Sequence, residues 1–110
     1  ELPPAKANYP YHYHMGSEEV FYIISGCGIL ETPEGDKPLK TGDVVVCPPG
    51  PEGAHRLVNT SREKLIYLDC DTVSDPEVVF YPRSDKVGVL SGGEARFYQA
   101  GEDTGYYEGE

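Results

Sequence analysis

Tryptophan is absent from this chain, methionine occurs once, and only three of the 110 residues are cysteines. Cys27, Cys47 and Cys70 are odd in number and widely spaced, which fits neither a disulfide framework nor a CxxC zinc site. Cys47 and Cys70 end apolar runs, so we expect both to be small buried hydrophobic residues. This usage of cysteine favours a reduced, cytoplasmic setting.

Positive charge is also scarce, because nine lysines and arginines stand against nineteen acidic residues, a formal net charge of −10. Long-range repulsion by this charge disfavours binding to nucleic acid and to anionic membranes. No apolar run approaches the roughly 18 residues of a membrane-spanning helix, and no signal peptide is recognisable. We therefore expect neither nucleic acid nor a membrane as a partner.

Helical periodicity is missing too, since no long stretch places apolar side chains at helical spacing. Thirteen glycines and ten prolines separate short segments rich in β-branched residues and tyrosine, which is typical of strands. We expect an extended segment at 9–14, a short strand around Leu39, and further strands at 20–25, 28–31, 44–47, 55–59, 65–70, 78–81, 87–90 and 95–98. Residues 60–64 are expected to form a hairpin turn that pairs 55–59 with 65–70. This pattern predicts an all-β fold, an antiparallel sandwich or barrel.

The length of the chain fits one domain, which we expect to span residues 1–110. Residues 71–110 are expected to form a C-terminal arm that packs along the domain or onto a neighbour, or a lid over the site. The segment 20–25 is apolar on both faces, because Phe21 and Ile23 alternate with apolar neighbours. One face can fill the core, and the other needs a second sheet or a partner subunit. This predicts a homodimer.

The three histidines point to a metal site. In a strand, residues i and i+2 project to the same face, so His12 and His14 present two imidazoles side by side. A carboxylate follows after a short loop, at Glu18 or Glu19, and His55 lies in another expected strand. Imidazole nitrogens with a carboxylate oxygen suit one divalent transition metal ion, Zn, Fe, Mn, Ni, Co or Cu, better than calcium.

These stretches resemble the two motifs of the cupin superfamily. The first motif, H-x-H, three or four residues, E, six residues, G, is matched by His12, His14, Glu19 and Gly26. The second, G, five residues, P-x-G, a short gap, H, three residues, N, is matched by Gly42, Pro48, Gly50, His55 and Asn59. The resemblance implies a small antiparallel β-barrel of the jelly-roll type, a double-stranded β-helix. It also implies a set of four metal ligands, His12, His14, Glu19 and His55, with Glu18 as the competing carboxylate.

The later stretch VVFYPRSDKVGVL and the ending YYEGE resemble a subgroup of bacterial single-domain cupins labelled sugar-phosphate isomerases by analogy of fold. This resemblance implies a metal-dependent enzyme that acts on a small oxygen-rich metabolite and isomerises a sugar or sugar phosphate. Two alternatives stay open: a dioxygenase-type cupin with the same ligands, and a non-catalytic cupin that binds or senses a small molecule.

Other candidate residues follow from strand alternation and charge. Tyr67 lies in the middle of a strand after the second motif, which makes it the candidate residue for binding substrate or moving a proton. Arg56 should point away from His55, toward the outer face or an interface. Arg83 and Lys86 can meet an anionic substrate, although ordinary surface charges are the simpler interpretation.

Overall fold

Short strands make up most of the computed structural model, which describes residues 1–110 without a gap. The strands are β1 (Tyr13–His14), β2 (Glu19–Ser25), β3 (Cys27–Thr32), β4 (Gly35–Lys40), β5 (Val44–Cys47), β6 (Arg56–Val58), β7 (Ile66–Asp71), β8 (Glu77–Tyr81), β9 (Lys86–Ser91) and β10 (Glu94–Gln99). The two helices, η1 (Pro51–Gly53) and η2 (Ala100–Glu102), are single 3-10 turns. Neither is long and apolar enough to cross a membrane. The all-β class is confirmed.

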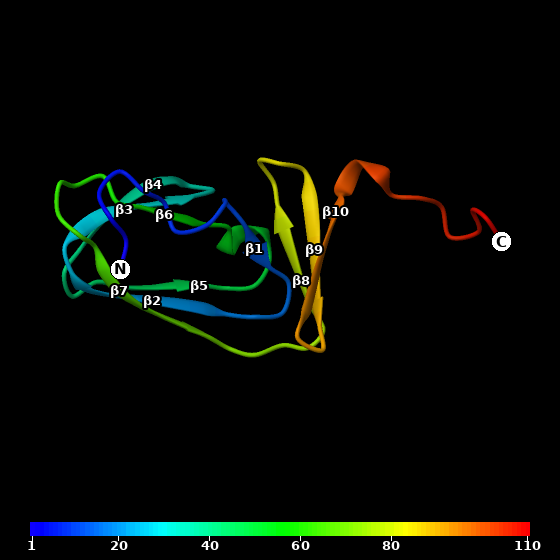
Figure 1. Cartoon of the computed structure of the whole chain (residues 1–110), viewed down its shortest axis with the longest axis horizontal. Coiled ribbons are helices and arrows are strands. Elements are labelled where there is room, and N and C mark those ends of the chain that lie inside the picture. The colour runs from blue at the N-terminus through cyan, green and yellow to red at the C-terminus, as the bar shows by residue number, and fades with distance from the viewer.

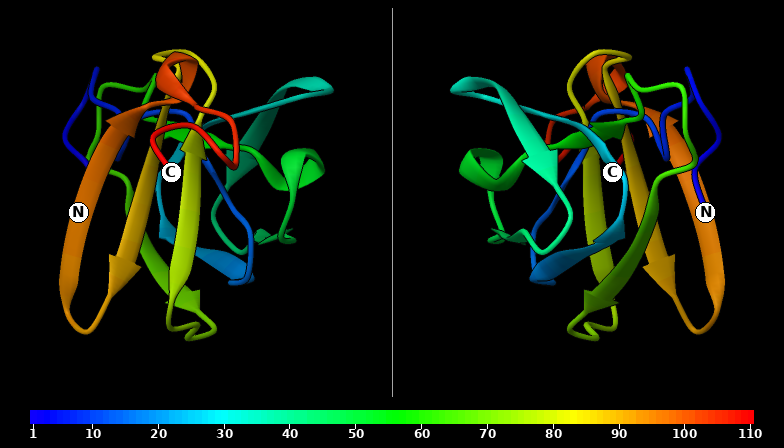
Figure 2. Two further views of the ribbon diagram at one scale, coloured as in Figure 1. Left: turned by 90° about the vertical axis from the view of Figure 1, so that its right-hand side faces the viewer. Right: turned by 90° about the vertical axis from the view of Figure 1, so that its left-hand side faces the viewer.

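Three antiparallel sheets arrange these strands in the orders β5-β2-β7, β4-β3-β6 and β1-β8-β9-β10. The first two sheets face each other as the layers of a sandwich (Figure 1), and the third stands across one end of it. The end-on view in Figure 2 shows β8, β9 and β10 side by side across that end. The layers are not joined into one closed barrel, but the antiparallel jelly-roll arrangement agrees with the sequence prediction.

The core lies between the two layers and follows the alternation of β2. Phe21 and Ile23 are fully buried, whereas Tyr22 and Ile24 on the other face are about half exposed. The core cluster consists of Leu2, Phe21, Ile23, Leu30, Leu39, Cys47, Leu57 and Leu65. Burial of Cys47 is therefore confirmed. The expectation for Cys70 is wrong, because Cys70 lies on the outward-facing side of β7 and is exposed.

Residues 60–64 do not form the expected hairpin, and that prediction is wrong. Strand β6 pairs with β3 while β7 pairs with β2, so this segment crosses from one layer to the other. The fully buried Asn59 holds the crossing. Its Nδ2 donates to the carbonyls of Leu2 and Glu63, at 2.9 and 2.7 Å, and its Oδ1 accepts from the N–H and hydroxyl of Ser61. These hydrogen bonds pair polar groups of the crossing segment that no neighbouring strand pairs.

The first twelve residues run beside β6 and the start of β7. Isolated antiparallel bridges join Leu2 to Leu65, Ala7 to Val58 and His12 to His55. The bridge at His12 carries two backbone hydrogen bonds, because each histidine donates its N–H to the carbonyl of the other, at 3.2 and 2.9 Å. The N-terminal segment thus leads directly into the first histidine pair.

The C-terminal third of the chain forms a meander rather than a loose extension. The predicted strands at 78–81, 87–90 and 95–98 correspond to β8, β9 and β10. Strand β8 pairs with the histidine strand β1, since His14 lies opposite Val79. Beyond η2 the chain runs away from the body (Figure 1), which gives the molecule extents of 55 × 24 × 23 Å. The sheet therefore covers the end of the sandwich at which the histidines lie.

Candidate metal centre

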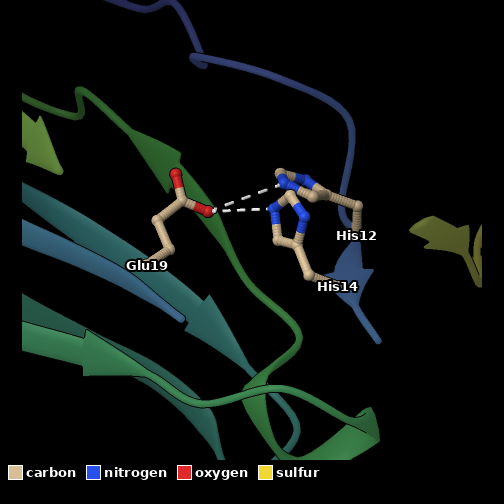
Figure 3. Close-up of side chains that lie close together, drawn as sticks. All are labelled: His12, His14 and Glu19. Atoms are coloured by element: carbon tan, nitrogen blue, oxygen red, sulfur yellow. Dashed lines mark ion pairs between the residues drawn. The ribbon is translucent and has the colours of Figure 1, made fainter. Parts of the chain in front are cut away.

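Four side chains from three segments of the chain meet at the end of the sandwich that faces β8. Glu19, the first residue of β2, shares the inner face with Phe21 and Ile23. Its Oε1 lies 2.8 Å from Nε2 of His55, 3.3 Å from Nε2 of His14 and 3.8 Å from Nε2 of His12. Figure 3 shows His12 and His14 side by side, both directed at the carboxylate of Glu19. The structure thus brings together His12, His14, Glu19 and His55.

Of the two candidate carboxylates, Glu18 and Glu19, the structure directs only Glu19 at the imidazoles. Glu18 is exposed, and its backbone N–H donates to the hydroxyl of Thr72 at 2.8 Å. Glu19 is 3% exposed and faces the imidazoles. Because successive residues of a strand point to opposite faces, only one of the two glutamates can reach this cluster.

Hydrogen bonds to backbone carbonyls orient two of the imidazoles. Nδ1 of His12 lies 2.7 Å from the carbonyl oxygen of Pro10, and Nδ1 of His55 lies 2.8 Å from that of Gly53. A carbonyl oxygen can only accept, so each Nδ1 carries a hydrogen, and in the neutral ring Nε2 holds the lone pair. Histidines that bind metals are usually oriented in this way. In both rings Nε2 is the nitrogen directed toward Glu19.

Gly53 can supply that carbonyl only because it has no side chain. A Cβ at this position would lie 1.7 Å from the carbonyl oxygen of Pro48. The close approach packs η1 against the residues that follow β5 and places the Gly53 carbonyl within hydrogen-bond distance of Nδ1 of His55. Pro48, in the P-x-G part of the second motif, and Gly53, in the gap that follows it, thus orient His55 through the backbone.

The loop between the first histidine pair and Glu19 is fixed by a buried carboxylate on β8. Glu77 is 5% exposed and accepts hydrogen bonds from the N–H groups of Met15 and Gly16, at 3.1 and 2.9 Å. It also accepts from the hydroxyl of Ser17 at 2.5 Å and from the N–H of Val78 at 3.1 Å. This contact joins the C-terminal sheet to the ligand loop.

The residues present fit a divalent ion. Oε1 of Glu19 and Nε2 of His55 are buried and close together, yet they lack hydrogen-bond geometry and have no other partner. Leaving a buried polar atom without a partner costs about 1–3 kcal/mol. A cation between them satisfies both atoms: a proton on Nε2 of His55 can do so in the metal-free protein, and three imidazoles with one carboxylate are also the donors that transition metals prefer.

Burial and neighbouring side chains shift the pKa values of two of the histidines. Burial lowers the pKa of His12, and the neighbouring imidazoles of His55 and His14 add to that effect. Burial alone would lower the pKa of His55, but contact with the side chains of Cys47 and Glu19 raises it to about 10. A metal ion must therefore displace a proton from His55 at neutral pH.

A cavity of about 300 Å³ opens onto the cluster and contains residues that the sequence analysis missed. It is lined by Tyr9, Pro10, His12, His14, Glu19, Asp69, Asp71, Val79, Tyr81 and Leu90. Carboxylate oxygens of Glu19, Asp69 and Asp71 lie within 4.8 Å of one another. Burial and the neighbouring carboxylates of Asp71 and Glu19 raise the pKa of Asp69 to about 8. Asp69 can therefore hold or release a proton near neutral pH.

Tyr67 shares a face of β7 with Asp69 and Asp71 but lies further along the sandwich. Its ring contacts Phe21, at 5.7 Å between centroids, and packs against the core. It does not line the 300 Å³ cavity, which Asp69 and Asp71 reach instead. Strand alternation could have identified Asp69 and Asp71 from the sequence, because it places them on the same face of the strand as Tyr67.

Comparison with known proteins agrees with this fold and site. A family model for the cupin domain matches residues 1–71. The chain is 36% identical to a glucose-6-phosphate isomerase of Thermococcus onnurineus (strain NA1), over 77% of this chain and 49% of that protein. It is 34% identical to an oxalate-binding protein of Thermotoga maritima, over 62% of this chain and 54% of that protein. The chain spans about half the length of these curated relatives.

A solved structure extends the likeness to the C-terminal sheet. This crystal structure, of a candidate sugar phosphate isomerase from Acidithiobacillus ferrooxidans ATCC 23270, has a TM-score of 0.86 and 30% sequence identity. The match covers 96% of this chain and 67% of the other. The common architecture therefore includes β8 and β9, which lie beyond the residues matched by the family model.

Proposed function

This chain belongs to the cupin domain family, and from that premise we propose that it is a metal-dependent isomerase of a small sugar or sugar phosphate. The observation that carries the proposal is the convergence of three imidazoles and Glu19 beside a cavity with two further carboxylates. Similarity to a glucose-6-phosphate isomerase and to a candidate sugar phosphate isomerase supports the reaction class. Residues 1–110 are proposed to act as one domain.

His12, His14, Glu19 and His55 would hold one divalent transition metal ion. Such an ion supplies Lewis-acid polarisation of adjacent carbonyl and hydroxyl oxygens. The four ligands come from three segments, and the backbone bridge between His12 and His55 fixes two of them relative to each other. The cavity volume of about 300 Å³ is at the small end of ligand sites, which suits a small metabolite.

Asp69 is the residue best placed to move the proton. Isomerisation of an aldose to a ketose transfers a proton between two adjacent carbons, so one base must reach both positions. Asp69 lines the cavity within 4.8 Å of a Glu19 oxygen, so it lies next to the ligand cluster. Asp71 is its neighbour on the same face and can exchange a proton with it. Tyr67 remains a proposed substrate residue only for a ligand that reaches deeper between the layers.

Two neighbouring glutamates provide a matched test of the metal site. We expect Glu19→Gln to lose most of its bound metal, because the substitution removes the only charged ligand, and Glu18→Gln to keep it. Metal content after purification without added metal gives the readout. Equal metal content in the two variants would contradict the ligand assignment.

An assay of turnover distinguishes the proposed isomerase from the two alternatives, a dioxygenase and a non-catalytic binding protein. We expect metal-loaded protein to interconvert an aldose phosphate and its ketose, and Asp69→Asn to lose this activity while it keeps its metal. Substrate-dependent oxygen uptake would instead indicate a dioxygenase. Tight binding of a small dicarboxylate without any turnover would favour a binding cupin, the alternative that similarity to an oxalate-binding protein supports.

A second copy of the chain is the proposed partner for the outer face of the β5-β2-β7 sheet. Cross-strand rows on this face join Val46 to Val20 and Cys70, and Val44 to Tyr22 and Leu68. Val44, Val46 and Leu68 are 60%, 54% and 52% exposed, which leaves a continuous apolar surface. We expect Val46→Glu to convert a dimer into a monomer by light scattering. Val73→Glu, at an exposed valine off the sheet, is the control.

A further inference from the structure

A second concavity lies on the opposite side of the segment that carries His12. It has a volume of about 630 Å³ and is lined by residues 5–11 together with Arg56, Arg83 and Ser84. Tyr9 and Pro10 line both this groove and the metal cavity. Tyr11 faces the groove while His12 faces the metal cavity, as alternation requires. The groove is thus separate from the metal cavity but shares a wall with it.

The groove gathers positive charge in a chain that has little of it. Lys6, Arg56 and Arg83 line it, three of the nine cationic residues in a chain of net charge −10. Glu31 on β3 is the carboxylate paired with both arginines, since its Oε1 lies 3.3 Å from Arg56 and 2.8 Å from Arg83. Three positive charges against one negative charge leave the groove with a local charge of about +2.

The two guanidinium groups are held in place before any ligand arrives. The Cζ of Arg83 lies 4.2 Å above the centroid of the Tyr11 ring, and Glu31 fixes the Nη1 of each arginine. Each guanidinium donates one hydrogen bond within the chain, although it carries five N–H donors. The remaining donors form the planar forks with which arginine recognises oxyanions.

We propose that this groove is a second ligand site, distinct from the metal cavity, that binds the phosphate group of a small metabolite. A phosphate dianion matches the local charge, and its oxygens can accept from both guanidinium groups and from Lys6. Pro10 lines the groove and its carbonyl accepts a hydrogen bond from Nδ1 of His12, so the two sites are adjacent.

Calorimetric titration with inorganic phosphate at low salt tests the site. We expect Arg56→Gln and Arg83→Gln each to weaken phosphate binding about tenfold or more, the usual effect of losing a hydrogen bond to a charged group. Arg96→Gln, which removes the same charge from the exposed strand β10, should bind within about twofold of the wild type. Equal weakening in all three variants would show a general charge effect and overturn the proposal.

The Glu19→Gln variant tests phosphate binding at the groove independently of the proposed isomerase activity. We expect phosphate to bind Glu19→Gln as it binds the wild type, whether or not any sugar phosphate is isomerised. Loss of phosphate binding in that variant would place the anion at the metal cavity and refute the second site. Succinate is a dianion whose oxygens belong to two planar carboxylates instead of one tetrahedral phosphate, so we expect it to bind more weakly. Equal affinity for succinate and phosphate would refute phosphate as the ligand class.

Discussion

Replacing Glu77 by alanine should destabilise the protein by about 2–4 kcal/mol. The carboxylate accepts three backbone hydrogen bonds and one from Ser17, and hydrogen bonds to a charged group contribute about 1.5–3 kcal/mol each, without full additivity. At about 4 °C per kcal/mol for a domain of this size, the expected fall in Tm is roughly 8–16 °C. Far-ultraviolet circular dichroism measures the change in free energy of unfolding in urea and the change in Tm on heating.

The same residue predicts a dependence of stability on pH. Burial raises the pKa of Glu77, but hydrogen bonds from Ser17, Gly16 and Val78 outweigh burial, so the pKa lies below its ordinary value. Stability from a lowered carboxyl pKa is present above the unfolded value of about 4.3 and is lost as pH falls through the folded value. The difference in free energy of unfolding between wild type and Glu77→Gln should therefore be largest at neutral pH and should shrink below about pH 4.

The exposed Glu94 on β10 supplies the control, because Glu94→Gln removes the same charge without a buried partner. A fall of less than about 0.5 kcal/mol in Glu77→Ala, the range of ordinary surface substitutions, would refute the assigned role. So would a gap between wild type and Glu77→Gln that stays constant from pH 7 to pH 3.

Three further results are expected. Asn59→Ala should lower the free energy of unfolding by about 2–4 kcal/mol in urea titrations, because it leaves the layer crossing with several unpaired buried groups. Gly53→Ala should reduce metal affinity in calorimetry, since a Cβ 1.7 Å from the Pro48 carbonyl oxygen must displace the carbonyl that orients His55. Gly105→Ala, where a Cβ meets nothing within 4 Å, should leave that affinity unchanged. Metal affinity should rise as pH rises through neutrality, because binding displaces a proton from His55, whose pKa is raised to about 10 in the metal-free protein; an affinity that is flat from pH 6 to 8 would contradict this.

The parts of the fold that sequence could predict are those fixed by local geometry. Alternation put Phe21 and Ile23 on one face of β2, because a strand has a strict period of two, and the structure shows that this face is the buried one. The i, i+2 spacing predicted that His12 and His14 lie side by side, and the family resemblance selected Glu19; the structure brings the three together because only a short loop separates them. Such features depend on neighbours in the chain, which a sequence displays directly.

Strand partners and long-range clusters were less accessible. Alternation tells which face a residue occupies but not which strand lies beside it, so the sequence favours a hairpin turn at 60–64 where the structure has a crossing between layers. Side chains of Asp69 and Asp71 meet Glu19 because β7 pairs with β2, a register that no local pattern encodes. The cationic groove combines Lys6 with Arg56 and Arg83, which are brought together only by the tertiary fold.

The backbone bridge between His12 and His55 makes the N-terminal segment part of the proposed ligand cage. Residues 2–12 are tied to β6 and Leu65 by a series of main-chain hydrogen bonds that ends at His12. If the proposed site is correct, fraying of this segment removes His12 from it, and a bound cation that links His12 to His55 would oppose fraying. Amide protons of Ala5, Asn8 and His12 should accordingly exchange with deuterium more slowly once the cage is filled, which makes the first dozen residues a built-in reporter of metal occupancy.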